Sequence, residues 1–74
     1  MKRPHTSVRE IEALLTAAMQ ARYPTTHHVG LLRRRGHGWR CFVRYELRGD
    51  DKGIPPTEEA DAMLVELEKQ YEIT

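Results

Sequence analysis

The arginines and aromatic residues between Leu31 and Arg48 are the residues of this sequence with the most distinctive chemistry. Six arginines share these eighteen positions with Trp39, Phe42 and Tyr45. A guanidinium group can bind phosphate oxygens through two parallel hydrogen bonds, and an aromatic ring can stack on a base. The stretch therefore indicates a surface for nucleic acid or for an acidic protein. The alternative is that the arginine stems only cover apolar side chains on an exposed sheet.

Metal binding and catalysis have less support in the sequence. The plausible zinc ligands are His27, His28, His37 and Cys41. Their spacing matches no established zinc finger, and Asp50 and Asp51 lie in a glycine-bounded stretch that is typical of a polar turn. No motif places a nucleophile beside a base, and no glycine-rich phosphate loop occurs. We therefore expect no enzyme activity, no cofactor and no metal.

Length and composition predict one small domain over residues 1–74. A chain of 74 residues is near the lower size at which a single core is sufficient for folding. The single cysteine excludes an internal disulfide, so association with another chain is the more plausible additional source of stability. The first ten residues lack the apolar segment of a secretory signal, and no apolar run approaches the roughly 20 residues that span a bilayer. We expect a cytoplasmic protein without membrane contact.

The formal net charge of +1 conceals a strong asymmetry along the chain. Residues 1–48 hold ten Lys and Arg against three Glu, which gives a net charge of +7. Residues 49–74 hold two Lys against eight Asp and Glu, which gives −6. Two regions of opposite potential can attract partners or let copies of the chain associate. The same charges could instead serve only to keep the surface hydrated.

A helix is predicted over residues 7–22, after a flexible N-terminus of residues 1–6. Ser7 and Glu10 have the spacing of a capping box, and Pro24 disfavours helical geometry at Tyr23. The apolar positions expected to form one buried stripe are Ile11, Leu14, Leu15, Ala18 and Met19.

Residues 28–48 predict a β-hairpin that turns at Gly36-His37-Gly38, where the glycines can adopt positive φ. Side chains alternate between the two faces of a strand. The residues expected on the inner face of the second strand are Trp39, Cys41, Val43, Tyr45 and Leu47. The preferred register pairs Leu31 with Val43, Val29 with Tyr45 and Leu32 with Phe42; a two-residue loop would change it. The residues expected to bind nucleic acid or another partner from the outer face are Leu32, Arg34, Arg40, Phe42, Arg44 and Arg48.

A second helix is predicted over residues 57–72, with Thr57 as its N-cap and carboxylates in its first turn. Its expected buried stripe consists of Ala60, Met63, Leu64, Leu67 and Tyr71. The fold class is therefore α+β: a small α-β-β-α domain with two helices packed on one face of an antiparallel hairpin. Leu15, Val43 and Leu67 are expected where the helices meet the sheet.

The sequence as a whole predicts a small non-enzymatic binding module, such as a phage or accessory regulatory protein. Its arginine-rich hairpin would contact nucleic acid or a nucleic-acid-associated protein. The alternative is a protein-interaction or inhibitor module that uses the acidic helix or the outer sheet face. The residues of that alternative surface are Glu59, Asp61, Glu66 and Glu68. A homodimer is a further alternative, because pairing of equivalent edge strands would give a continuous four-stranded sheet.

One family resembles this chain in the order and character of its segments. The segments are "IEALLTAAMQARYP" (residues 11–24), "HVGLL" (residues 28–32) and "TEEADAMLVELEKQYE" (residues 57–72). Together they resemble the DNA-damage-inducible I proteins, which are small modulators of recombinase filaments. Those proteins begin with an additional strand, which "MKRPHTS" does not obviously provide, and their hairpin is less rich in arginine. The resemblance implies that the acidic helix is the working surface and that the partner is a DNA-coated recombinase.

Overall fold

A computed structural model describes residues 3–36, 38–47 and 53–73 of the chain. Its elements are β1 (His5–Thr6), α1 (Val8–Arg22), β2 (Thr26–Arg34), β3 (Gly38–Tyr45), α2 (Thr57–Gln70) and β4 (Glu72–Ile73). The prediction of a small α+β domain with an antiparallel hairpin is confirmed. Two short strands are additional: β1 pairs in parallel with β4, so that the stretch expected to be a flexible N-terminus contains a strand.

Helix α1 begins at the residue after its predicted cap. The Glu10 amide donates to Ser7 Oγ at 3.2 Å, which confirms this half of the capping box. The Glu10 carboxylate accepts a hydrogen bond from the Thr6 hydroxyl at 2.6 Å. The buried line is narrower than expected, because Ile11, Leu15 and Met19 are buried whereas Leu14 is 50% exposed. Ala18 is exposed as well, so the predicted stripe is wrong at both of these positions.

The hairpin of β2 and β3 has a register that differs from the preferred one. Val29 pairs with Val43 and Leu31 pairs with Cys41, so β3 is shifted by two residues relative to the prediction. A shift of two residues keeps the same side chains inside, because side chains alternate with period two. Gly36 and Gly38 have φ of 75° and 74°, which confirms the predicted role of glycine in this turn.

The expected inner face of β3 is correct near its middle and wrong at its far end. Cys41 is buried, and Trp39 and Val43 pack against the core. Tyr45 and Leu47 are exposed, at 43% and 47%. Near Tyr45 the register shifts between Thr26 and His28, and β3 ends before Leu47 is reached, so the simple alternation does not continue.

Helix α2 begins at Thr57, and Pro56 is its N-cap. The prediction of Thr57 as the N-cap is therefore wrong, and the cap has no side-chain hydrogen bond. Glu58 and Glu59 lie in the first turn, where carboxylates interact favourably with the helix dipole. The predicted apolar stripe is confirmed: Ala60 and Leu64 are buried, and the other members are partly buried against the core.

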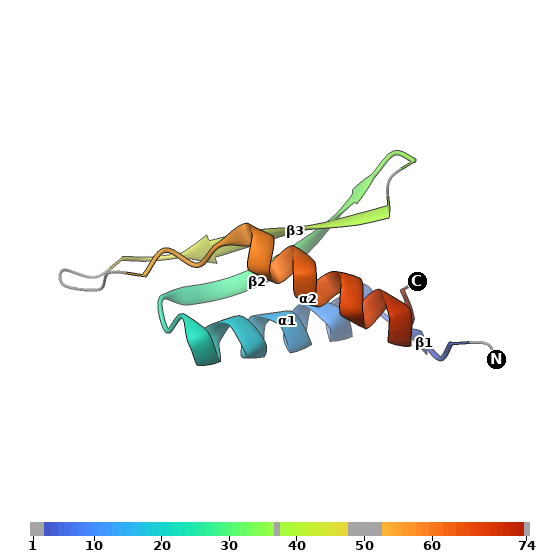
Figure 1. Cartoon of the computed structure of the whole chain (residues 1–74), viewed down its shortest axis with the longest axis horizontal. Helices are drawn as coiled ribbons and strands as arrows, with labels where there is room; N and C mark the ends of the chain where they lie inside the picture. Colours follow the sequence, from blue (N-terminus) through green and yellow to red (C-terminus); the bar gives the residue numbers. More distant parts are fainter. Residues whose placement is uncertain (1–2, 37, 48–52, 74) are drawn as a thin grey trace.

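The core is formed by both helices and both hairpin strands. Its buried residues are Ile11, Leu15, Met19, Val29, Leu31, Cys41, Ala60 and Leu64. Helix α1 packs against β2, and α2 packs against β3. Figure 1 shows α1 below the hairpin and α2 running down from it, while the right-hand end of the β2 and β3 ribbons rises away from both helices. The radius of gyration is 13.0 Å, compared with about 11 Å for a compact chain of this length. The molecule is therefore elongated.

Side chains of the two helices accept hydrogen bonds from the outer edges of the hairpin. The Val29 amide donates to Thr16 Oγ1 at 3.0 Å, and the Leu31 amide donates to Glu12 Oε2 at 2.8 Å. On the other edge, the Cys41 amide donates to Asp61 Oδ1 at 2.9 Å. An additional strand would have to displace these acceptors in order to pair at the same positions. The homodimer stays a prediction, but pairing through these edges loses its main support.

Candidate functional site

The outer face of the hairpin is defined by three pairs of residues from β2 and β3. They are His28 with Arg44, Gly30 with Phe42, and Leu32 with Arg40. Their neighbours in the strands, Val29, Leu31 and Cys41, are buried, so these pairs point away from the helices. Arg40, Phe42, Arg44 and Leu32, which the sequence predicted for this surface, thus lie together on one face.

Phe42 lies at the centre of the outer face and reaches across to the neighbouring strand. A Cβ atom added to Gly30 would be 2.1 Å from Phe42 Cζ, so the ring occupies the space of the missing side chain. The His28 ring meets the Phe42 ring edge-on, with centroids 6.4 Å apart and an interplanar angle of 62°. Phe42 remains partly exposed. The ring is thus supported from within the chain and still accessible.

Positive charge lies on both sides of Phe42 along β3. Arg40 and Arg44 are both exposed, and neither forms an ion pair with a carboxylate in the part of the chain that the structure describes. The six outer-face positions in β2 and β3 contain no Asp or Glu. Of the other predicted residues, Arg48 lies outside the described residues, and only the backbone of Arg34 is described, opposite Gly38.

The turn end of the hairpin adds further basic residues. The guanidinium carbon of Arg33 lies 5.8 Å from the centroid of the Trp39 ring, within the range of a cation–π contact. Arg33 and Arg35 are exposed. Arg33 and Trp39 share the inner side of the hairpin with Leu31 and Cys41, so their contact lies on the face opposite to Phe42.

The acidic residues of α2 do not form a single surface. Glu59 accepts a hydrogen bond from the Tyr23 hydroxyl at 2.5 Å and pairs with Arg22. Asp61 is directed at β3 and accepts the Cys41 amide. Glu66 is exposed and pairs with Lys69 at 3.1 Å, while Glu68 is half-buried. The alternative partner surface is therefore divided, and two of its four carboxylates are bonded to other elements of the fold.

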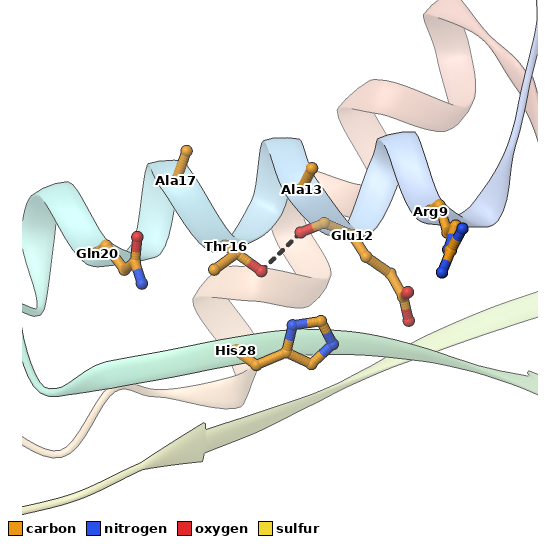
Figure 2. A pocket seen from close by; sticks show the side chains of 7 residues that line it. All are labelled: Arg9, Glu12, Ala13, Thr16, Ala17, Gln20 and His28. Carbon is orange, nitrogen blue, oxygen red and sulfur yellow. Dashed lines mark hydrogen bonds between the residues drawn. The ribbon is translucent and has the colours of Figure 1, made fainter.

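A shallow hollow lies between α1 and β2, at the side of the outer face. Its lining residues are Arg9, Glu12, Ala13, Thr16, Ala17, Gln20 and His28. Figure 2 shows the Thr16 hydroxyl donating to the Glu12 carbonyl oxygen, with the ring of His28 across from the helix. Since Glu12 and Thr16 also accept the edge amides of β2, the polar groups of the hollow serve the helix–strand contact.

Potential metal ligands are separated in the structure. Cys41 lies on the inner face of the hairpin, whereas His28 lies on the outer face. His27 contacts Glu46 at 3.0 Å, and His37, like Asp50 and Asp51, lies outside the described residues. Within the described ranges, no three His, Cys, Asp or Glu side chains form a group that could hold a metal ion.

Cys41 is expected to be unreactive in the folded protein. Burial raises the pKa of its thiol from the ordinary value of 9.0 to about 12, and the nearby Asp61 carboxylate acts in the same direction. Because the thiolate is the reactive form, an aromatic disulfide reagent at pH 8 should label the folded chain about 1000-fold more slowly than the unfolded chain. Equally rapid labelling with and without denaturant would contradict the assignment of Cys41 to the buried inner face.

The neutral Cys41 thiol also contributes to the free energy of unfolding. This contribution is present below pH 9 and is lost as the pH rises toward 12.

Comparisons with known proteins give no further guidance. No family model, no curated protein and no solved structure matches the chain. The resemblance to the DNA-damage-inducible I proteins therefore stays a prediction. Considering the described residues alone, neither helix has the length and apolar character needed to cross a membrane.

The sequence prediction missed two residues of the outer face, His28 and Gly30. Side chains of a strand alternate between its faces, so residues 28 and 30 share the face of Leu32. The sequence alone was therefore sufficient to place His28 and Gly30 on the outer face. A glycine inside a strand often marks close approach of another group, which here is the Phe42 ring. The preferred register concealed this relation because it placed Leu32 opposite Phe42.

Proposed function

We propose that this protein is a non-enzymatic binding module that contacts nucleic acid through the outer face of its hairpin. The observation that carries the proposal is the Phe42 ring between Arg40 and Arg44, on a face without carboxylates at its six strand positions. Guanidinium groups suit phosphate oxygens, and an accessible ring suits a base. A cytoplasmic regulatory or accessory role, for example in a phage, is part of the same proposal.

The comparison of the two charged surfaces supports the hairpin over the acidic helix. On α2, Glu59 and Asp61 already accept hydrogen bonds from other elements of the fold. Arg40 and Arg44 have no such internal role among the described residues, so they can bind a partner without loss of internal contacts. An acidic protein surface is the competing partner for the same arginines.

Exchanging Arg40 and Arg44 together for Glu should abolish nucleic acid binding and leave the fold intact. Both side chains are exposed, and the exchange replaces attraction to phosphates by repulsion. Titration of labelled single strands and duplexes, monitored by fluorescence anisotropy at low salt, measures the loss. The matched control combines Lys69→Glu with Ala62→Glu and Gln70→Glu, which changes the net charge by the same amount at exposed positions of α2.

Salt and nuclease distinguish nucleic acid from an acidic protein. The affinity of the parent for nucleic acid should fall steeply with added salt, because each neutralised phosphate releases condensed counterions. Unchanged binding by the Arg40 and Arg44 variant would remove the hairpin from the interface. No binding by the parent at low salt, or capture of a protein from lysate that persists after nuclease treatment, would refute the proposed function.

A further inference from the structure

Gly30 lies beneath the Phe42 ring. The ring, and not the backbone conformation, explains why a glycine occupies this position. Among the described glycines, only Gly36 and Gly38 have positive φ, so the conformation at Gly30 is open to other residues. Glycine inside a strand is unfavourable relative to alanine, because it loses more conformational freedom on folding. At Gly30, any Cβ atom would overlap the outer end of the Phe42 ring, with contacts of 2.1 to 2.9 Å. The strand therefore leaves room for the ring at this position.

The position of the ring is further defined by its neighbours on the outer face. His28 lies beside it edge-on, and Leu32, which is 55% exposed, lies one outward position further along β2. An aromatic ring that is already held in one position loses little conformational freedom when a flat ligand stacks on it. The outer face thus has an aromatic ring that rests over Gly30 and against His28 and is still partly exposed.

The arginines are arranged for a ligand that carries a negative charge on both sides of a flat group. Arg40 and Arg44 are four residues apart on β3, which corresponds to about 13 Å along a strand, and Phe42 lies midway between them. A nucleotide within a single strand has a phosphate on each side of its base. In a duplex the faces of the bases are covered by their neighbours, and exposing a face requires unstacking at a cost in free energy. An accessible ring therefore favours single strands.

We infer that the outer face binds single-stranded nucleic acid, with one base stacked on Phe42 and the flanking phosphates held by Arg40 and Arg44. This inference rests on the proposed function and specifies its ligand. Its distinctive element is the ring, because arginines alone would bind duplex and single strands by charge. DNA and RNA single strands share the required base face and phosphates.

The test compares short labelled oligo-dT, oligo-U and a duplex of the same length at one low salt concentration. The parent should bind both single strands more tightly than the duplex. Phe42→Ala should weaken single-strand binding roughly tenfold or more and leave duplex binding nearly unchanged. Val65→Ala, which removes an exposed apolar side chain on α2 and away from the outer face, is the control and should change neither.

Gly30→Ala provides an independent variant that retains every charge and the ring itself. The new methyl group would displace the outer end of the Phe42 side chain, and it should therefore weaken single-strand binding in the same direction as Phe42→Ala. Circular dichroism establishes that each variant is folded. If Phe42→Ala does not fold, Gly30→Ala decides the question.

The outcomes separate this inference from the proposed function. Equal or tighter binding of duplex by the parent, or full single-strand affinity in both folded ring variants, would overturn the stacking inference while the arginine surface remains. Loss of affinity in both ring variants on single strands alone would support it. If the parent binds none of the three probes, the proposed function fails as well.

Discussion

Replacing Leu15 by alanine should cost about 2 to 5 kcal/mol of the free energy of unfolding. Leu15 is 1% exposed and belongs to the cluster that joins both helices to both hairpin strands. The loss combines the removed apolar burial with the cavity that the surrounding residues cannot fill. A domain of this length has a total stability of roughly 4 to 11 kcal/mol, so the variant should be close to unfolding. Urea unfolding followed by circular dichroism measures the difference.

Leu14→Ala is the matched control for that experiment. It makes the same chemical change one residue earlier in α1, at a side chain that is 50% exposed. Exposed substitutions usually change stability by no more than about 0.5 kcal/mol. If Leu14→Ala and Leu15→Ala were equally destabilising, the face of α1 that packs on the hairpin would be wrongly assigned.

Asp61→Ala should destabilise the domain by about 1 to 3 kcal/mol through a different mechanism. It leaves the Cys41 amide, at the outer edge of β3, without its acceptor at 2.9 Å. Asp61→Asn retains an acceptor oxygen and should recover part of the loss. Glu66→Ala is the control, because Glu66 is exposed and contacts only Lys69 among the described residues. Such surface pairs contribute about 0 to 1 kcal/mol.

Thermal and urea unfolding of these three variants measure the contribution of the edge acceptor. The predicted order of stability is Glu66→Ala, then Asp61→Asn, then Asp61→Ala as the least stable. If Asp61→Ala were as stable as the parent, water would satisfy the Cys41 amide equally well. The hydrogen bond between α2 and β3 would then have no part in holding the helix to the sheet.

The elements of the fold could be predicted because strong local signals mark them. Ser7 caps the first helix, the glycines at 36 and 38 form the turn, and apolar residues at helical spacing mark α2. The register of the hairpin could not be predicted in the same way. Two registers that differ by two residues bury the same side chains, so burial alone does not choose between them. In the structure the Phe42 ring lies over Gly30, a contact that the alternative pairing lacks.

Polar residues beside an apolar stripe were the least predictable part of the helices. Glu12 and Thr16 on α1 have the appearance of a solvated helix surface, yet both accept amides of β2. Their role depends on which strand edge lies next to the helix, and this is a property of the tertiary arrangement. The width of the buried stripe has the same cause, because a two-stranded sheet covers only one line of α1 side chains and leaves Leu14 exposed.

The candidate site was partly predictable from the period of a strand. Arg40, Phe42 and Arg44 alternate with Trp39, Cys41 and Val43, which are buried or packed against the core, so the sequence was sufficient to place them on one face. Their partners on β2 depended on the register, and His28 and Gly30 were missed for that reason. The acidic residues of α2 stay a predicted partner surface, although Glu59 and Asp61 also accept hydrogen bonds from other parts of the fold, which their sequence pattern did not indicate.

The edge acceptors also determine what amide hydrogen exchange would report in this domain. The amides of Val29 and Leu31 are bonded to α1, and the amide of Cys41 is bonded to α2, whereas the alternate amides of a two-stranded antiparallel sheet are bonded to the opposite strand. Exchange at Val29 and Leu31 therefore records the release of α1, and exchange at Cys41 records the release of α2. Equal protection at all three sites would mean that the two helices leave the hairpin together, as a single cooperative unit.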